Sequence, residues 1–310
     1  MRWVRIFNSS GKASQSCKLI ADLEQLTDSS EQEQVAQNTP ELTEKQQQEA
    51  EERTSVSAVV VHEAIRQDGE EELNRSVSAL AWSGLAAGMS MGFSFVGQAL
   101  AYAHLPDTPW RPLLVRLGYP VGFLIVIIGR QQLFTENTLT AIIPLLAQRN
   151  WSTFLRVLRL WAVVLVANLL GAHLFAWVVG NTPMFSPQVQ HAMLDLARTA
   201  MHVTFGAAII RGIFAGWLIA MVVWMLAAID QGRVAVIIIL TYVVGLAEFT
   251  HIIAGAVEVL FLAMVGDRSW WSIVEGYLIP TLIGNIIGGV SLTAAVNHAQ
   301  VVAGMNKKSS

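Results

Sequence analysis

Residues 117–147 read LGYPVGFLIVIIGRQQLFTENTLTAIIPLLA, a hydrophobic stretch that is interrupted near its middle. The apolar run 117–128 stops at Gly-Arg-Gln-Gln (129–132), and apolar residues dominate again from 139 to 147. Each arm is shorter than the roughly 20 residues that a helix needs to cross a bilayer. Because lipid offers no partners for polar groups, such a break must face protein or a water-filled cavity. The stretch therefore predicts a broken membrane helix whose break faces protein or a water-filled cavity.

A second interrupted stretch lies later in the chain. The apolar run 234–247 stops at Glu-Phe-Thr-His (248–251) and resumes toward residue 265. Leu133-Phe134-Thr135 resembles Glu248-Phe249-Thr250 at an offset of 115 residues, and ANLLGA (167–172) resembles GNIIGG (284–289) at an offset of 117. Short, interrupted segments at matching places in two halves indicate a transport site built on an internal repeat.

Four uninterrupted apolar segments flank the two broken ones, at 77–103, 160–179, 212–228 and 276–296. Their lengths are near those of single membrane spans. The order is full, broken and full helix, twice, in repeats at about 76–180 and 203–300. Because each repeat crosses the membrane three times, the second must enter from the opposite side. We therefore expect an all-α integral membrane protein in the lipid bilayer, with six transmembrane segments as two inverted three-helix repeats.

Three further segments lie outside this transmembrane channel domain (76–300). Residues 1–55 are rich in glutamine and acids, which predicts a disordered cytoplasmic tail. Residues 56–75 predict an amphipathic helix, at the membrane surface or against the base of the protein, or else a plain solvated helix. Residues 301–310 form a C-terminal tail. Eight basic residues flank the spans on the side of the termini and four on the other, which predicts both termini in the cytoplasm.

Composition argues against several classes of function. Charged residues make up 14% of the chain, whereas about a quarter is usual for soluble domains. Residues 1–75 hold fifteen acids and eight bases, and nothing clusters the positive charge that nucleic acid requires. The N-terminus lacks the apolar run of a signal peptide, and Cys17 is the single cysteine. We find no motif for a metal, a cofactor or an enzymatic reaction, since His251 and Glu258 lack a third ligand nearby.

His251 and Thr135 are the leading candidates for a pore site. A histidine with an ordinary pKa of about 6.5 can hold or release a proton at cellular pH, so His251 in a pore can protonate a passing weak-acid anion. The alternative is a histidine bonded to a backbone carbonyl that the break sets free. Thr135 and Thr250 can donate to a solute or cap exposed carbonyls. Repeat symmetry predicts that Thr135 lies opposite His251.

The remaining candidates also lie at or near the breaks. Phe134 and Phe249 are apolar gates if they face the pore, and otherwise ordinary packing residues. Leu133, directly before Phe134, is a further candidate pore residue. Arg130 and Arg211 can attract anions, or can extend to the interface or pair with an acid. The glycines of the full helices are better explained by close helix contacts.

The motifs LFTENT (133–138) and FTH (249–251), together with the repeat, resemble the formate/nitrite transporter family, and most closely its YfdC-like bacterial branch. The resemblance covers about residues 60–300. It implies an aquaporin-like protomer and a homopentamer with one pore in each subunit, in a bacterial inner membrane. It implies substrates that are small monovalent anions or their weak acids, such as formate, nitrite or hydrosulfide. It also makes Thr135, Phe134 and His251 the threonine, gating aromatic and central histidine of the pore.

The chain departs from the family pattern at four positions. Gln132 and Thr250 stand where the family commonly has acids, Ala200 replaces a lysine, and Gly216 replaces a pore-side asparagine. These changes remove polar and charged groups, which suits the alternative of a channel for a neutral small solute. A third hypothesis is a membrane sensor or scaffold that acts through the acidic tail. We expect a channel for monovalent anions or their weak acids.

Overall fold

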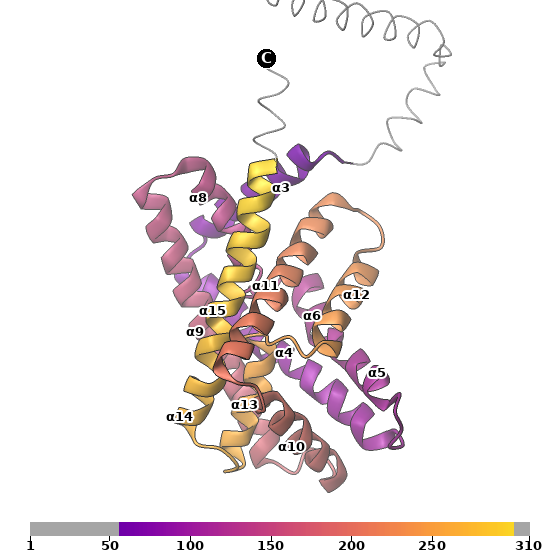
Figure 1. Cartoon of the computed structure of the whole chain (residues 1–310). Coiled ribbons are helices and arrows are strands. Elements are labelled where there is room, and N and C mark those ends of the chain that lie inside the picture. The colour runs from indigo at the N-terminus through magenta and orange to yellow at the C-terminus, as the bar shows by residue number, and fades with distance from the viewer. Residues whose placement is uncertain (1–55, 301–310) are drawn as a thin grey trace, which may run out of the picture. The chain divides into compact units, whose positions relative to one another are not determined.

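The structure, a computed structural model, describes residues 56–300, with the exception of the side chains at 292, 293 and 295. The expectations for the tails 1–55 and 301–310 lie outside the described residues. All the regular secondary structure of the described part is helical (Figure 1). Its helices up to residue 201 are α3 (Ala58–Asn74), α4 (Val77–His104), α5 (Arg111–Val115), η1 (Arg116–Gly118), α6 (Pro120–Ile128), α7 (Asn137–Thr140), α8 (Ile142–Gln148), α9 (Trp151–Asn181) and α10 (Pro187–Met201). The later ones are α11 (Phe205–Ala228), α12 (Arg233–Leu246), α13 (Ala254–Met264), α14 (Trp270–Ile273), η2 (Val274–Leu278), α15 (Ile279–Ile287) and η3 (Gly288–Ala295).

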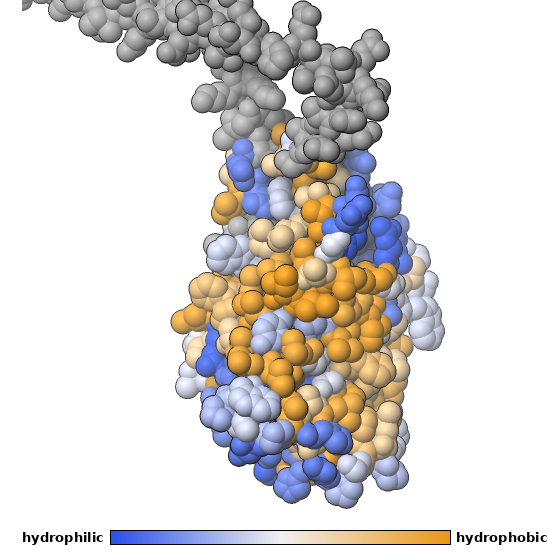
Figure 2. Space-filling view, turned by 90° about the vertical axis from the view of Figure 1, so that its right-hand side faces the viewer, coloured by the Kyte–Doolittle hydropathy of each residue, from blue (hydrophilic) through white to orange (hydrophobic). Residues whose placement is uncertain are grey.

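Five helical segments of the described chain are long and apolar enough to cross a membrane, judged by length and composition. They are Val77–His104, Arg111–Ile128, Trp151–Asn181, Phe205–Ala228 and Trp270–Gln300. α12 and α13 are apolar but shorter. Figure 2 shows a band of hydrophobic residues between hydrophilic ends on one face of the molecule, as expected for a protein surrounded by lipid.

Several helices extend beyond the apolar runs in the sequence. α9 begins at Trp151, nine residues before the predicted span that begins at residue 160. The additional turns carry two arginines. Arg156 donates to the Asn74 side chain at 3.2 Å, and Arg159 donates to the Leu73 carbonyl at 2.6 Å. A hydropathy pattern cannot detect such turns because protein contacts rather than lipid satisfy their charges. α10, at 187–201, fills the segment between the predicted repeats.

Close contacts between helices explain the glycines of the full spans. α4 packs most extensively against α9, and α11 against α15. A Cβ atom on Gly88 would press against the Asn168 carbonyl, and one on Gly216 would press against the Asn285 carbonyl. Gly171 packs in the same way against backbone of α4. Small residues let two membrane helices approach until their backbones touch, so these positions are structural.

The amphipathic helix α3 is docked on the body of the protein. Its apolar edge includes Ile65 and Leu73, each 1% exposed, and it contacts α7, α8, α9 and α11. Gly69 lies directly against the Thr140 carbonyl. α3 therefore packs against the other helices through its apolar edge.

Candidate pore site

The first break follows α6. The chain turns at Arg130, whose φ of 50° lies in the left-handed region, and one buried side chain then holds the irregular backbone. Asn168 on α9 accepts a hydrogen bond at Oδ1 from the Phe134 N–H, at 2.9 Å. Its Nδ2 donates to the carbonyls of Gln132 and Gly84, at 2.9 and 2.7 Å. These bonds satisfy backbone groups that a helix would otherwise pair internally.

The second break follows α12 and repeats this arrangement. The chain turns at Glu248, with a φ of 52°. Asn285 on α15 accepts a hydrogen bond from the Ile252 N–H at 2.8 Å. Its Nδ2 donates to the carbonyls of Thr250 and Gly212, both at 2.9 Å. The two asparagines, 117 residues apart as the sequence pattern indicates, perform the same task in the two halves.

This hydrogen bonding corrects the alignment of the two breaks. Equivalent bonds pair Phe134 with Ile252 and Gln132 with Thr250, an offset of 118 residues. The predicted pairing of Phe134 with Phe249, and of Thr135 with Thr250, was wrong by three residues. Both breaks contain the letters Phe-Thr, but the backbone groups that each asparagine binds determine which positions correspond.

Thr135 and His251 meet in the protein interior. The Thr135 Oγ1 atom lies 2.9 Å from His251 Nε2, and the two residues are 0% and 1% exposed. Thr135 is contributed by the first break and His251 by the second, as expected. Phe123 of α6 presents its ring to His251 in an edge-to-face arrangement, with centroids 5.1 Å apart. Phe123 therefore covers one side of the His251 ring with apolar surface.

The other nitrogen of His251 serves the backbone. Nδ1 accepts hydrogen bonds from the N–H groups of Ile253 and Ala254, at 3.2 and 3.1 Å, at the beginning of α13. An accepting Nδ1 carries no proton, so this network assigns the neutral ring's proton to Nε2, which then donates to Thr135. The histidine thus bonds to freed N–H groups of the break, and not to a freed carbonyl as its structural alternative assumed.

The aromatic and hydroxyl candidates differ in their surroundings. The Phe134 side chain is 1% exposed and packs edge to face on Trp161 of α9, with centroids 5.8 Å apart. Phe249 stacks on Phe214 of α11 at 5.4 Å and also lines a cavity. The Thr250 hydroxyl donates to the Ala208 carbonyl at 2.8 Å, which is the capping role.

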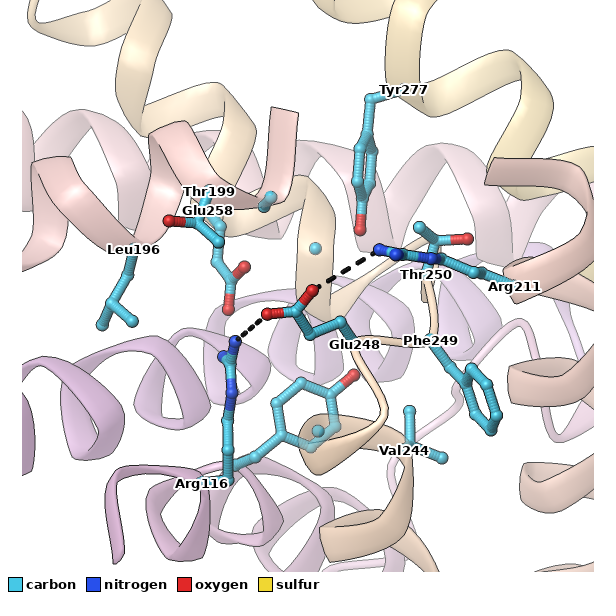
Figure 3. Close-up of a pocket in the computed structure, with 14 residues that line it drawn as sticks. Arg116, Leu196, Thr199, Arg211, Val244, Glu248, Phe249, Thr250, Glu258 and Tyr277 are labelled. Atoms are coloured by element: carbon cyan, nitrogen blue, oxygen red, sulfur yellow. Dashed lines mark hydrogen bonds and ion pairs between the residues drawn. The ribbon is translucent and has the colours of Figure 1, made fainter. Parts of the chain in front are cut away.

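A small cavity adjoins the second break, and we call it the arginine cavity (Figure 3). Its volume is about 40 Å³, room for roughly three water molecules. Residues of six helices and of the break line it. They are Arg116, Tyr119, Leu196, Thr199, Ala200, Arg211, Val244, Gly245, Glu248, Phe249, Thr250, Gly255, Glu258 and Tyr277.

Charged groups in the arginine cavity form one connected cluster. Glu248 pairs with Arg116 at 3.4 Å and with Arg211 at 3.5 Å. Arg116 also donates to the Gln98 side-chain oxygen at 2.6 Å, and the Gln98 amide donates to Glu258 at 3.1 Å. Arg211, a sequence candidate, therefore belongs to the cavity. Arg116 was missed as a site residue, although it directly precedes the apolar arm 117–128.

A larger cavity lies next to the first break, beneath α3, and we call it the α3 cavity. Its volume is about 620 Å³, and Arg130, Gln132 and Glu136 are among the residues that line it. Glu72 of α3 reaches into this region and accepts hydrogen bonds from Gln132 at 3.0 Å and from Thr140 at 2.9 Å. Burial raises the pKa of the Glu72 carboxyl, and these two hydrogen bonds oppose the shift.

Chain neighbours of Thr135 and His251 line the two cavities. Thr250, next to His251 in the chain, lines the arginine cavity. Glu136, next to Thr135, lines the α3 cavity. Leu133 is 0% exposed and lines neither cavity.

The structure shows where two of the four departures from the family pattern lie. Ala200 lines the arginine cavity, so a side chain at this position would face it. Gly216 does not face a cavity, because it packs against Asn285. The assignment of Gly216 to a pore-side position was therefore wrong. Among residues 56–300 no group of three or more histidine, cysteine or acidic side chains is placed to hold a metal ion.

Comparison with known proteins gives consistent results. Residues 59–299 match the sequence profile of formate/nitrite transporters. The chain is 41% identical over 258 residues to the inner membrane protein YfdC of Escherichia coli, covering 83% of each chain. It is 23% identical over 235 residues to the formate channel BtFdhC of Bacillus thuringiensis, covering 74% of this chain and 89% of that one. A solved pentameric formate channel with formate bound superposes with a TM-score of 0.61 at 23% identity, covering 76% of this chain and 99% of that one.

Proposed function

Because the chain belongs to the formate/nitrite transporter family, a family of membrane transporters and not of enzymes, we propose that it is a channel for small monovalent anions or their weak acids. The observation that carries the proposal is the buried Thr135–His251 contact, because the adjacent residues Thr250 and Glu136 each line a cavity. We infer that a solute moving from one cavity to the other passes this contact. Two of the proteins that it resembles are formate channels, which supports formate as the first substrate to test.

The mechanism that the geometry favours uses a neutral histidine. His251 Nε2–H and the Thr135 hydroxyl are the two polar donors in the apolar layer, and an anion stripped of water requires such donors. A second proton on His251 would have to enter at Nδ1, where it would displace two N–H groups of α13. The sequence predicted that His251 gives a proton to the anion. We propose instead that the neutral His251 only donates a hydrogen bond to it. The pH dependence of flux then follows the acid–base equilibrium of the solute.

We further propose the architecture expected from the sequence. The equivalent roles of Asn168 and Asn285 support two inverted three-helix repeats, each with a broken second helix, in an aquaporin-like protomer. The relatives support a homopentamer in the lipid bilayer of a bacterial inner membrane. The excess of basic residues beside the termini supports a cytoplasmic location for both ends. Cysteine labelling of intact cells at Asn181 and Gln148 tests this orientation, because only Asn181 should react from outside.

A matched pair of threonine variants tests the proposed pore contact. Thr135→Val removes the hydroxyl that faces His251, whereas Thr250→Val removes a hydroxyl that caps a carbonyl of α11. In proteoliposomes we expect formate flux to fall about tenfold or more in Thr135→Val, since loss of one good donor costs on the order of 1.4 kcal/mol or more. Flux in Thr250→Val should stay near that of the wild type. Equal flux in Thr135→Val and the wild type would contradict the proposal.

One observation favours a neutral solute as the second candidate. Arg116 and Arg211 both pair with Glu248, and Glu258 also lines the arginine cavity, so the cavity offers a passing anion little net positive charge. Osmotic swelling of vesicles by an uncharged solute, without flux of formate or nitrite at any pH, would select this function.

A further inference from the structure

Glu248 occupies a backbone position that suits glycine. It follows the C-terminus of α12 with a φ of 52°, in the left-handed region. Glycine is the usual residue at such positions because a side chain makes the conformation costly. In the described part of the chain only Arg130 and Arg149 share a positive φ among residues other than glycine. A glutamate at a site that glycine fits better indicates that the carboxylate itself is useful.

The carboxylate of Glu248 lies between two guanidinium groups. Figure 3 shows it reaching from the break toward Arg116 on one side and Arg211 on the other. The N–O distances of 3.4 and 3.5 Å are longer than the roughly 2.7–2.9 Å of strong charge-assisted hydrogen bonds. The side chain is also 46% exposed. Glu248 therefore bridges the two arginines through loose ion pairs that another anion can replace.

From this arrangement we propose that Arg116 and Arg211 form an anion-binding site, and that the Glu248 carboxylate occupies it as an internal competitor until a small planar anion displaces it. The inference rests on the proposed function and identifies where the solute binds before it reaches His251. Guanidinium groups match the two oxygens of a carboxylate or of a nitrite-like anion. The cavity volume of about 40 Å³ suits a solute of a few heavy atoms.

Competition between Glu248 and the anion changes the net charge of the arginine cavity. Glu258 also faces this cluster, held by Gln98, which in turn binds Arg116. With Glu248 in place, two guanidinium groups face two carboxylates. When Glu248 moves away, the site gains one net positive charge and becomes attractive to an anion. Competition of this kind keeps the solute weakly bound, and weak binding permits rapid release, as conduction requires.

Glu248→Gln tests the proposal, with Asp267→Asn as its matched control. Asp267 also pairs with two arginines, Arg198 and Arg268, but does not line the cavity. The two substitutions remove the same charge, so the control measures the general electrostatic effect. In proteoliposomes the formate concentration at half-maximal flux should fall about tenfold in Glu248→Gln and stay within twofold of the wild type in Asp267→Asn. Glu248→Gly should reproduce the fall, because it also removes the carboxylate. Adding Arg211→Gln to Glu248→Gln should reverse it.

A binding measurement separates this inference from the proposed function. Formate should raise the thermal unfolding temperature of detergent-purified Glu248→Gln more than that of Asp267→Asn at the same concentration. Normal flux in the wild type, with equal half-saturation in Glu248→Gln and Asp267→Asn, would overturn the inference and leave the channel function intact. Stabilisation of Glu248→Gln by formate without flux in any variant would support the binding site and overturn the function. Neither flux nor selective stabilisation would overturn both.

Discussion

The two asparagines that hold the breaks give the account its sharpest energetic prediction. Asn285→Ala removes three buried hydrogen bonds and leaves the Ile252 N–H and the carbonyls of Thr250 and Gly212 without that partner. Hydrogen bonds between membrane helices are worth about 0.6 kcal/mol on average. A buried group left unsatisfied costs about 1–3 kcal/mol. We therefore expect a loss of roughly 2–5 kcal/mol, because partial relaxation will recover some of the larger value.

The matching substitution in the first repeat should have a similar effect. Asn168 makes the same three kinds of bond, so Asn168→Ala should lower the free energy of unfolding by an amount within about 1 kcal/mol of the Asn285→Ala value. Asn181→Ala is the control, because Asn181 is exposed and bonds only to a carbonyl of its own helix. Surface changes of that kind usually shift stability by no more than about 0.5 kcal/mol.

Denaturation in mixed micelles measures these differences, and amide hydrogen exchange locates them. Exchange should accelerate at Ile252 in Asn285→Ala and at Phe134 in Asn168→Ala, since each loses the oxygen that its N–H binds. If Asn285→Ala were as stable as Asn181→Ala, with unchanged exchange at Ile252, the reasoning about the breaks would be refuted.

Two further predictions concern helix packing and the docking of α3. Gly216→Ala should destabilise the protein by about 2 kcal/mol or more in thermal unfolding, because the added Cβ would press on the Asn285 carbonyl. The control is Gly206→Ala on the same helix, which should be neutral because an added Cβ there meets open space. Burial raises the pKa of Glu72 in the docked helix above its ordinary value of 4.5, so docking should weaken as pH rises from about 4.5 through the raised pKa. Hydrogen exchange of α3, corrected for intrinsic rates, should show this weakening in the wild type and in the control Glu71→Gln but not in Glu72→Gln; equal pH dependence in all three would contradict it.

Much of the fold could be predicted because lipid imposes simple rules on the sequence. Long apolar runs identified the full helices, and the polar interruptions located both breaks, since a polar segment in a span needs a protein partner or water. The Asn-x-x-Gly segments matched correctly because asparagine binds freed backbone and the following glycine permits close approach. These features are local, and a single sequence displays them.

The parts that were not predicted depend on contacts between distant segments. The predicted offset between the breaks was wrong because it aligned the Phe-Thr pair that both breaks contain. The residues that correspond are those whose backbone groups bond to Asn168 and Asn285. The bonds at His251 Nδ1 depend on how the chain turns into α13, which no spacing indicates. The cluster of Arg116, Gln98 and Glu258 joins residues up to 160 positions apart, so its members look like unrelated flanking charges in the sequence.

The most direct test of the central claim is the flux of formate, nitrite and hydrosulfide into proteoliposomes of wild type and His251→Phe. Measurements at about pH 5 and pH 7.5 vary the protonation of the weakest of these acids and bracket the ordinary pKa of histidine. If the solute passes the Thr135–His251 contact, at least one of the three should enter the wild-type vesicles and should not enter those with the variant. Undiminished flux through correctly assembled His251→Phe, with the same pH dependence, would contradict it.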